Sequence, residues 1–352
     1  MTDLECHLKQ RIAVSGPMTV ADYMSECLMH PEHGYYSTRD PFGVGGDFTT
    51  APEISQMFGE FVGLSLAQSW IDQGAPGAFV LAELGPGRGT LMADILRAAA
   101  SVPGFVEAAQ VALVETSPAL RTQQRDRLGD DVIWVDMIDQ LPGGPLFLVA
   151  NEFFDALPIR QFVRDAEAWR ERVVTVTDGA LGFGLSQPVR LGALEGRFFD
   201  TAPGGLVEIC PAANPIMSYL GTRILAEGGA ALIIDYGDVR SGGDTLQAIH
   251  RHEYSGVFDN PGNADLTAHV DFGALAEATP AHCYGPVTQG IWLERLGITA
   301  RARKLARQLE GHAFESHIAA HRRLTHPEEM GTLFKTLGVL PFDAPPPPGF
   351  TQ

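Results

Sequence analysis

An acid, three glycines and the start of a helical pattern follow one another in residues 79–90, at spacings that suit a ligand site. Glu83 lies near the end of the apolar run 79–84, and the glycines stand at alternate positions after that run. The three glycines are Gly85, Gly87 and Gly89. Glycines allow a tight turn and let a ligand approach the backbone, while the following helix presents N–H groups to it. The pattern predicts a nucleotide-type site at the carboxyl end of a buried strand.

Two ligand classes compete for this turn. Dinucleotide sites read GxGxxG, but here the spacing is GxGxG and Thr90 takes the place of the third dinucleotide glycine. The Glu83 carboxylate would repel a pyrophosphate but suits an ammonium group, which S-adenosylmethionine (SAM) carries beside its sulfonium. The string ExGxGxG at a strand end resembles the first motif of class I SAM-dependent methyltransferases. We therefore expect SAM, and a nicotinamide oxidoreductase is the disfavoured alternative. The residues expected to contact SAM at this turn are Glu83, Gly85, Pro86, Gly87 and Gly89.

Three further candidate cofactor contacts follow the next two predicted strands. Glu115 ends the strand 110–115, where an acid accepts hydrogen bonds from ribose hydroxyls. The alternative is a surface acid that happens to end a strand. Asp136 and Met137 follow the short strand 132–135, where a polar group and an apolar side chain would meet an adenine. A plain turn would explain this pair equally well.

The loop after the fourth predicted strand, 145–150, is rich in polar and aromatic groups. Its first five residues are Asn151, Glu152, Phe153, Phe154 and Asp155. Because ligands of parallel sheets bind outside the carboxyl ends of strands, this loop should face the reactive end of the cofactor, with Asn151 in contact with it. A helix N-cap at Asn151 with acids in its first turn is the alternative, and it leaves the two phenylalanines unexplained.

Other chemistries find little support. His250, His252 and His269 form a weak metal pattern, and loop anchoring explains them better, so we expect no metal. The sequence has no GxSxG string, no Cys–His pairing and no P-loop lysine, so nucleophilic hydrolysis and nucleotide hydrolysis are not indicated.

Composition narrows the class of partner and compartment. The net charge of −18 over 352 residues argues against a general nucleic-acid binder and is compatible with a basic protein partner. No long apolar run predicts a membrane span. The scattered cysteines predict free thiols in a reducing compartment, and the first residues resemble neither a signal nor a transit peptide. The cysteines are Cys6, Cys27, Cys210 and Cys283. A cytoplasmic protein is the expectation.

The elements that must position these residues begin with helices in 1–30 and 53–73, separated by a long loop. From residue 79 strands and helices alternate, which predicts a parallel βαβ series with right-handed crossovers. Residues 160–205 look like an inserted antiparallel region, and 238–272 look irregular. The predicted strands are 79–84, 110–115, 132–135, 145–150, 230–237, 281–287 and 332–340, and the later helices are 90–99, 117–128, 212–227 and 271–278.

This organisation predicts an α/β fold with a Rossmann-like seven-stranded sheet, an N-terminal helical extension and an inserted α+β region. We place the SAM-binding core in two segments of the chain, with the insertion between them. The expected parts are the helical extension with a covering loop (1–75), the core (76–159 and 228–342), the insertion (160–227) and an extended or disordered proline-rich tail (343–352).

Five strings together are similar to the MidA family, whose mitochondrial member is a complex I assembly factor that methylates an arginine. They are 33–36 (HGYY), 45–55 (GGDFTTAPEIS), 83–91 (ELGPGRGTL), 151–158 (NEFFDALP) and 265–272 (DLTAHVDF). The resemblance spans roughly residues 10 to 340 and implies a class I methyltransferase fold, SAM as cofactor and protein arginine methylation. It also implies a protein substrate, which in the mitochondrial member belongs to a respiratory complex. The absent transit peptide suggests a bacterial, cytoplasmic member; a processed protein of the mitochondrial matrix is the alternative.

An arginine substrate would give the fourth loop a role. A guanidinium stays charged in water and is held by carboxylates through paired hydrogen bonds. Glu152 and Asp155 are the acids best placed for this, so we predict them as the catalytic pair, with the loop 42–52 and the two phenylalanines walling the pocket. A SAM-binding assembly chaperone with little turnover and a small-molecule methyltransferase stay open as alternatives. The oligomeric state has no sequence signal.

Overall fold

The computed structural model describes residues 2–38 and 50–351, and the chain divides into two compact units. Three chain segments make up each unit, so both are composite. We call them the large unit (Thr49–Phe154, Pro215–Val239 and Phe272–Gln352) and the small unit (Met1–Phe48, Asp155–Asn214 and Arg240–Asp271).

The large unit is built on a mixed sheet with the strand order β15-β16-β10-β5-β2-β3-β4. The strands from β10 to β4 run parallel to their neighbours, while β16 is antiparallel to both β15 and β10. The strands are β2 (Phe79–Leu84), β3 (Ala109–Val114), β4 (Ile133–Val135), β5 (Leu146–Asn151), β10 (Gly229–Asp238), β15 (His282–Thr288) and β16 (Phe334–Leu340). The predicted α/β fold is confirmed: these seven strands form the continuous path of a mostly parallel sheet of eight, and the carboxyl ends of its parallel strands meet at one edge.

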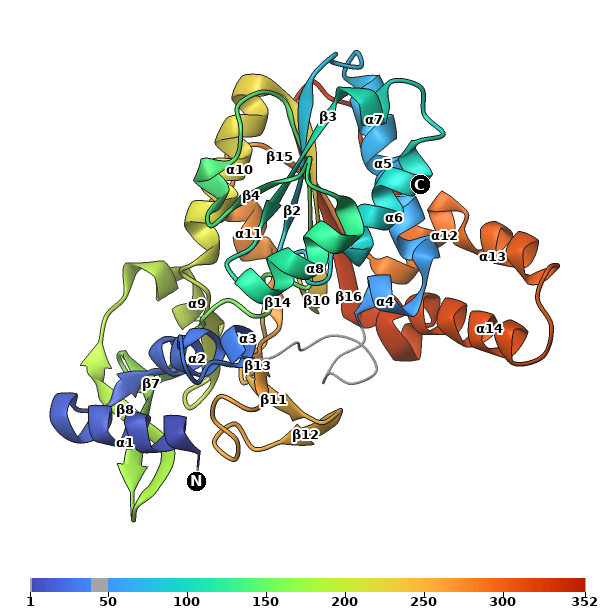
Figure 1. The fold of residues 1–352 in the computed structure, drawn as a ribbon. Coiled ribbons are helices and arrows are strands. Elements are labelled where there is room, and N and C mark those ends of the chain that lie inside the picture. The colour runs from blue at the N-terminus through green and yellow to red at the C-terminus, as the bar shows by residue number, and fades with distance from the viewer. Residues whose placement is uncertain (1, 39–49, 352) are drawn as a thin grey trace. The chain divides into compact units, whose positions relative to one another are not determined.

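Helices cover both faces of this sheet, with α5 and α6 on one face and α10 and α11 on the other (Figure 1). The helices up to α8 are α4 (Ala51–Ile54), α5 (Gln56–Asp72), α6 (Thr90–Ala99), α7 (Phe105–Ala108) and α8 (Pro118–Leu128). Those that follow are α10 (Ala213–Glu227), α11 (Phe272–Ala278), α12 (Gln289–Leu296), α13 (Ile298–Ala306) and α14 (Gly311–Thr325), with the short turns η1 (Ile138–Gln140) and η3 (Pro327–Gly331). No helix or strand was predicted from sequence for residues 289–331, which form α12 to α14 and η3.

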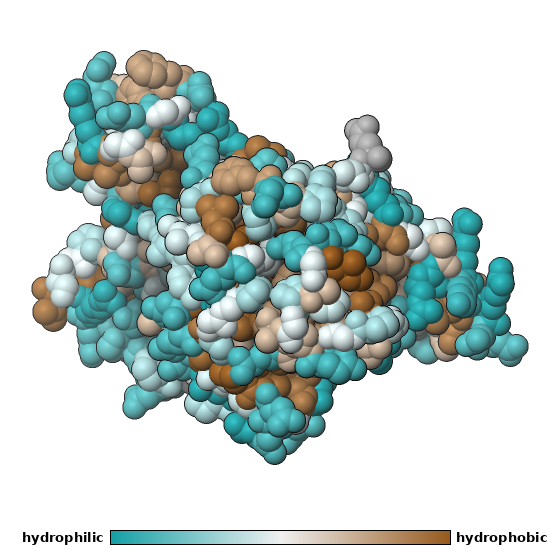
Figure 2. Space-filling model, turned by 90° about the horizontal axis from the view of Figure 1, so that it is seen from above, coloured by the Kyte–Doolittle hydropathy of each residue, from teal (hydrophilic) through white to brown (hydrophobic). Residues whose placement is uncertain are grey.

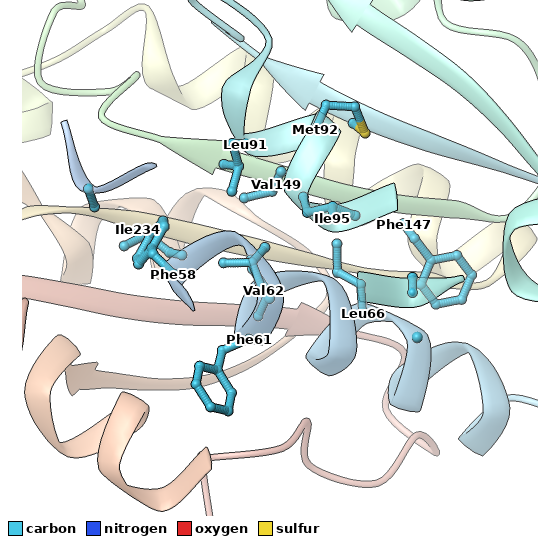
Figure 3. Close-up of a cluster of buried hydrophobic side chains, with 14 of the residues drawn as sticks. Phe58, Phe61, Val62, Leu66, Leu91, Met92, Ile95, Phe147, Val149 and Ile234 are labelled. Atoms are coloured by element: carbon cyan, nitrogen blue, oxygen red, sulfur yellow. The ribbon is translucent and has the colours of Figure 1, made fainter. Parts of the chain in front are cut away.

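The core under the site comes from α5, α6 and the central strands. Phe58, Val62 and Leu66 of α5 face Ile95 of α6 and Val149 of β5, and all are buried (Figure 3). The two helices approach closely because α5 has a glycine at position 63, where a Cβ would lie 2.9 Å from the backbone of Ile95. This packing fixes the start of α6, and with it the glycine turn, on the sheet.

The small unit contains a five-stranded antiparallel sheet and a second sheet of three short strands. The first is β1 (Met18–Thr19), β6 (Arg160–Arg164), β7 (Trp169–Thr177), β8 (Ala180–Val189) and β9 (Leu206–Ile209), and the second is β11 (Gln247–His250), β12 (Glu253–Ser255) and β13 (Asp265–Thr267). The remaining elements are α1 (Asp3–Ser15), α2 (Val20–Met29), α3 (Tyr35–Thr38), η2 (Gly192–Leu194), α9 (Glu195–Phe198) and β14 (Val270–Asp271). A reciprocal capping box of Thr19 and Asp22 starts α2.

Several predictions of local structure need correction. Residues 238–272 were predicted to be irregular but contain the strands β11 to β13. Each has only three or four residues, which is too short to show a clear alternation of apolar and polar residues. The expected helix 53–73 is interrupted at Ser55, whose extended backbone caps α5. The proline-rich tail, expected to be extended or disordered, is part of the large unit, where the indole Nε1 of Trp292 donates to the carbonyl of Pro348 at 3.1 Å.

The two units also divide the chain differently from the domain boundaries expected from sequence. α1 to α3 belong to the small unit and α4 and α5 to the large one, and residues 240–271 join the small unit. Contacts between distant segments explain the last point. The N–H of Ala268 donates to the carbonyl of Asp155 at 3.0 Å, and the Tyr23 hydroxyl donates to that of Val257 at 2.6 Å. Residues 42–49 of the predicted covering loop lie outside the described residues.

The surface seen in Figure 2 is mostly hydrophilic, with apolar residues exposed singly and in small groups. Such scattered exposure is ordinary for folded proteins. Within residues 2–38 and 50–351, no helix has both the length and the apolar character that crossing a membrane requires.

Candidate functional site

The glycine turn joins β2 to α6 as the sequence predicts. Gly85, Gly87 and Gly89 all have left-handed backbones, with φ of 60°, 51° and 75°. A Cβ at Gly85 would lie 3.0 Å from the ring of Phe153, so the aromatic residue of the fourth-strand loop packs against the turn. The N-cap residue of α6, Gly89, makes no side-chain capping bond. The first turn of a helix carries N–H groups without intrahelical partners, and a ligand can use those that remain.

Glu83 is buried beneath this turn, with 3% of its surface exposed. Burial raises the pKa of its carboxyl to about 8, against the opposing effect of a hydrogen bond from the Met92 N–H, and the nearby Glu115 raises it further. Among the described residues, Oε2 of Glu83 has no hydrogen-bond partner. A buried acceptor without a donor fits a ligand that brings an ammonium group.

Glu115, at the end of β3, is held by a polar network. Its Oε1 accepts from the Ser117 N–H at 2.7 Å and its Oε2 from Gln124 Nε2 at 3.3 Å. Burial is the main reason that the pKa of Glu115 is raised. Gln124 also donates to the Gly87 carbonyl at 2.6 Å and accepts from Trp134 at 2.8 Å, so this fully buried amide ties the glycine turn to β3 and β4.

Sequence reasoning missed Gln124. Its signal was a polar residue four positions after Leu120, on the apolar face of α8.

Asp136 and Met137 lie on the open loop after β4. Asp136 pairs with Arg121 at 2.7 Å with its side chain 65% exposed, and Met137 is 55% exposed. The N–H groups of both residues donate to Gln140 Oε1. Their role at an adenine stays a prediction.

The end of β5 places Asn151 and Glu152 in a constrained arrangement. Glu152 has φ of 51°, a left-handed backbone that is uncommon outside glycine. Its Oε1 accepts from Asn151 Nδ2 at 3.0 Å and from the N–H of Ala51, the first residue of α4, at 3.1 Å. No helix follows in 152–158, so the N-cap interpretation of Asn151 is wrong. Strained backbone that neighbouring groups hold in place is typical of functional loops.

Two further acids of the large unit were missed: Asp235 supports this loop, and Glu53 holds the first residue of α6. Asp235, near the end of β10, is fully buried and accepts from the Phe154 N–H at 3.0 Å and from the Tyr236 N–H at 2.9 Å. Glu53 of α4 accepts from the Thr90 hydroxyl at 2.5 Å. In the sequence, Asp235 resembles Glu83, because both are acids near the end of an apolar strand. Nothing near Glu53 in the sequence indicates that it contacts Thr90.

Asp155 belongs to the small unit and Glu152 to the large unit. Asp155 is buried, with 6% of its surface exposed. In the small unit the Tyr36 hydroxyl contacts both carboxylate oxygens of Asp265 at 3.1 Å. Burial and the charges of Asp265 and Asp155 raise the pKa of Tyr36 well above its ordinary value. The joint action of Glu152 and Asp155 on one acceptor stays a prediction.

One other group of described side chains has the spacing of metal ligands. Donor atoms of His7, Glu26 and His30 lie within 4.8 Å of one another. Glu26 already pairs with Arg11 at 2.6 Å. Nδ1 of His30 accepts two backbone N–H groups, which places the ring proton of the neutral side chain on Nε2 and makes it a poor ligand. His250, one of the histidines considered from sequence, instead contacts the carbonyl of Asn263 at 2.7 Å, as a loop anchor would.

Comparison with known proteins agrees with this arrangement. A family model described as "Putative S-adenosyl-L-methionine-dependent methyltransferase" matches residues 61–287. The chain is 37% identical over 368 residues to "Protein arginine methyltransferase NDUFAF7, mitochondrial" of Xenopus laevis, covering 95% of this chain and 84% of that protein. It is 34% identical over 372 residues to the Homo sapiens protein of that name, covering 97% and 84%. A Burkholderia thailandensis protein solved with S-adenosyl-homocysteine gives a TM-score of 0.82 at 30% identity, covering 99% of this chain and 92% of that one.

The doubly covered α/β sheet, with its glycine turn and acids at the strand ends, is the fold of a class I SAM-dependent methyltransferase. The chain belongs to the SAM-dependent methyltransferase family that the model describes, and its predicted membership of the MidA family is confirmed. SAM is its cofactor.

The buried Glu83 predicts a proton release on SAM binding. At about pH 6.5 the SAM ammonium is charged, but Glu83, with a pKa of about 8, holds its proton. If the SAM ammonium contacts the Glu83 carboxyl, binding lowers the pKa of that carboxyl and releases up to one proton. The affinity for SAM therefore rises with pH over the range below about 8. Calorimetry in two buffers of different ionisation enthalpy measures this release. The Glu83→Gln variant should release none, and equal proton release in that variant would remove Glu83 from the ammonium site.

Proposed function

We propose that this enzyme methylates an arginine side chain of a partner protein. The observation that carries the proposal is the Glu152 carboxylate at the carboxyl end of β5, which two hydrogen bonds hold in place. The next residue, Phe153, packs against the glycine turn. A guanidinium keeps its charge near neutral pH, so a site that takes it needs a carboxylate held in a fixed direction. The names of the relatives, protein arginine methyltransferases, support the same substrate class.

When bound, SAM would supply an electrophilic methyl group for a nitrogen of the acceptor. The chain's part is to hold both molecules in line, which is worth up to about 7–11 kcal/mol of the barrier. In the proposed arrangement Glu152, with Asp155, orients the guanidinium, and Phe153 and Phe154 exclude water. The residues proposed to hold SAM are Glu83, Gly85, Pro86, Gly87, Gly89, Glu115, Asp136 and Met137.

We also propose that the substrate is a subunit of a respiratory complex and that the protein acts in the cytoplasm. The relatives cited here are named as mitochondrial proteins. The net charge of −18 suits a basic partner region around the acceptor arginine.

The direct test is to incubate the protein with labelled SAM and a lysate of cells lacking it, and to map the labelled residue by mass spectrometry. Methylarginine on a discrete protein supports the proposal. Label on another residue type, or on small molecules alone, would refute arginine methylation. SAM binding without any transfer would favour the assembly-chaperone alternative.

The ribose contact gives a separate prediction. Glu115→Ala should weaken SAM binding by about 1.5–3 kcal/mol, the range for hydrogen bonds to a charged group. Glu107→Ala, an exposed acid on α7, is the matched control and should bind SAM as the wild type does. Titration calorimetry distinguishes the two, and an unchanged dissociation constant in Glu115→Ala would make this residue a structural acid only.

A further inference from the structure

Only the nitrogen of the Asn151 side-chain amide forms a hydrogen bond with a described residue. The side chain is 8% exposed, and its Nδ2 donates to Glu152 Oε1 at 3.0 Å. Its Oδ1 has no hydrogen-bond partner among the residues that the structure describes. A buried carbonyl oxygen left without a donor costs about 1–3 kcal/mol, so this atom indicates a ligand that brings an N–H or O–H group.

The direction of the amide is fixed by its neighbour. A carboxylate only accepts hydrogen bonds, so the nitrogen of Asn151 must face Glu152 and the oxygen must face away from it. Glu152 is itself held by the Ala51 N–H and by its own N–H, which donates to the Ile234 carbonyl at 2.9 Å. Two consecutive residues thus present a neutral amide oxygen and a carboxylate from a rigid strand end.

We propose that Asn151 binds the methyl acceptor, its Oδ1 accepting an N–H from the same guanidinium whose charge Glu152 holds. This inference rests on the proposed function and revises the expectation that Asn151 contacts SAM. A guanidinium is planar and its three nitrogens direct N–H groups along different sides, so oxygens of two adjacent residues can accept from different nitrogens and fix its plane. A lysine ammonium presents its donors from one point and would gain less from this pair.

The test compares Asn151→Ala with the wild type on an arginine-containing acceptor identified by mass spectrometry. The expected result is a fall in kcat/KM of roughly tenfold to a hundredfold, with the SAM dissociation constant changed less than about twofold. Asn214→Ala, an exposed asparagine at the start of α10, is the control and should match the wild type. SAM binding also reports that the variants are folded.

Asn151→Asp separates direct contact from positioning of Glu152. It keeps an acceptor oxygen but replaces the amide donor with a second acid, and two adjacent carboxylates raise the pKa of one of them. If Oδ1 contacts the acceptor, this variant recovers transfer at high pH, where both acids are ionised and no donor faces Glu152, whereas Asn151→Ala stays impaired throughout.

Three results would overturn the inference. Equal losses of SAM affinity and transfer in Asn151→Ala would place the residue in the cofactor site. Asn151→Asp as inactive as Asn151→Ala at every pH would limit Asn151 to holding Glu152. Wild-type transfer in Asn151→Ala would remove it from the site while leaving arginine methylation intact. If the wild type methylates no arginine at all, the proposed function fails first, and this inference fails with it.

Discussion

Gly87→Val should abolish measurable SAM binding while the protein stays folded. The residue has φ of 51°, where a β-branched side chain is strained, and it stands in the turn that the ligand must approach. Its carbonyl accepts the Gln124 amide, so a shift of this backbone also disturbs the network that holds Glu115. We expect at least a hundredfold loss of affinity, which is about 2.7 kcal/mol.

Gly297→Val is the matched control for backbone strain. Gly297 also has a left-handed backbone, with φ of 95°, but caps the end of α12 with nothing within 4 Å of a Cβ placed there. Thermal melts of both variants report stability, and titration calorimetry reports SAM binding. If Gly87→Val binds SAM as the wild type does, the cofactor site is misplaced; if Gly297→Val also loses binding, strain alone explains the effect.

Glu152→Gln should nearly abolish methyl transfer and leave SAM affinity almost intact. The substitution keeps the shape and one acceptor oxygen but removes the charge that would pair with a guanidinium. Losing one partner of a buried charge pair costs about 2–5 kcal/mol, which predicts a fall in kcat/KM of about thirtyfold to several thousandfold. Transfer by the wild type to a basic acceptor should also slow as salt rises, because the chain carries a net charge of −18.

Asp155→Asn is measured beside it, since both acids were predicted to hold the acceptor. Glu315→Gln, an exposed acid on α14, serves as the control for removing one negative charge. Methyl transfer and SAM binding are recorded for each variant. Loss of SAM binding together with transfer would place Glu152 in the cofactor site, and full activity in both Glu152→Gln and Asp155→Asn would contradict the assignment of an acceptor site to this loop.

The local features of the site could be predicted because nearby residues determine them. The run 79–84 forms β2, the alternate glycines form the left-handed turn, and the helical spacing after Thr90 gives α6 over Thr90–Ala99. Each depends on backbone preferences and hydrophobic periodicity within about one turn or strand. The SAM cofactor, predicted from Glu83 before this turn, followed from the same local information and is confirmed by the family.

The tertiary structure alone decided which polar groups meet at the carboxyl end of the sheet. Glu152 accepts an N–H from Ala51, 101 residues earlier, and Asp235 accepts one from Phe154, 81 residues before it. Gln124 reaches the Gly87 carbonyl across 37 residues. Partners of buried polar groups depend on which strand ends and helices the topology brings together, and no pattern within a single element encodes that choice. The sequence therefore determined the turn, the sheet and the cofactor class, while only the assembled sheet revealed that Asn151 keeps an acceptor oxygen without a partner among the described residues.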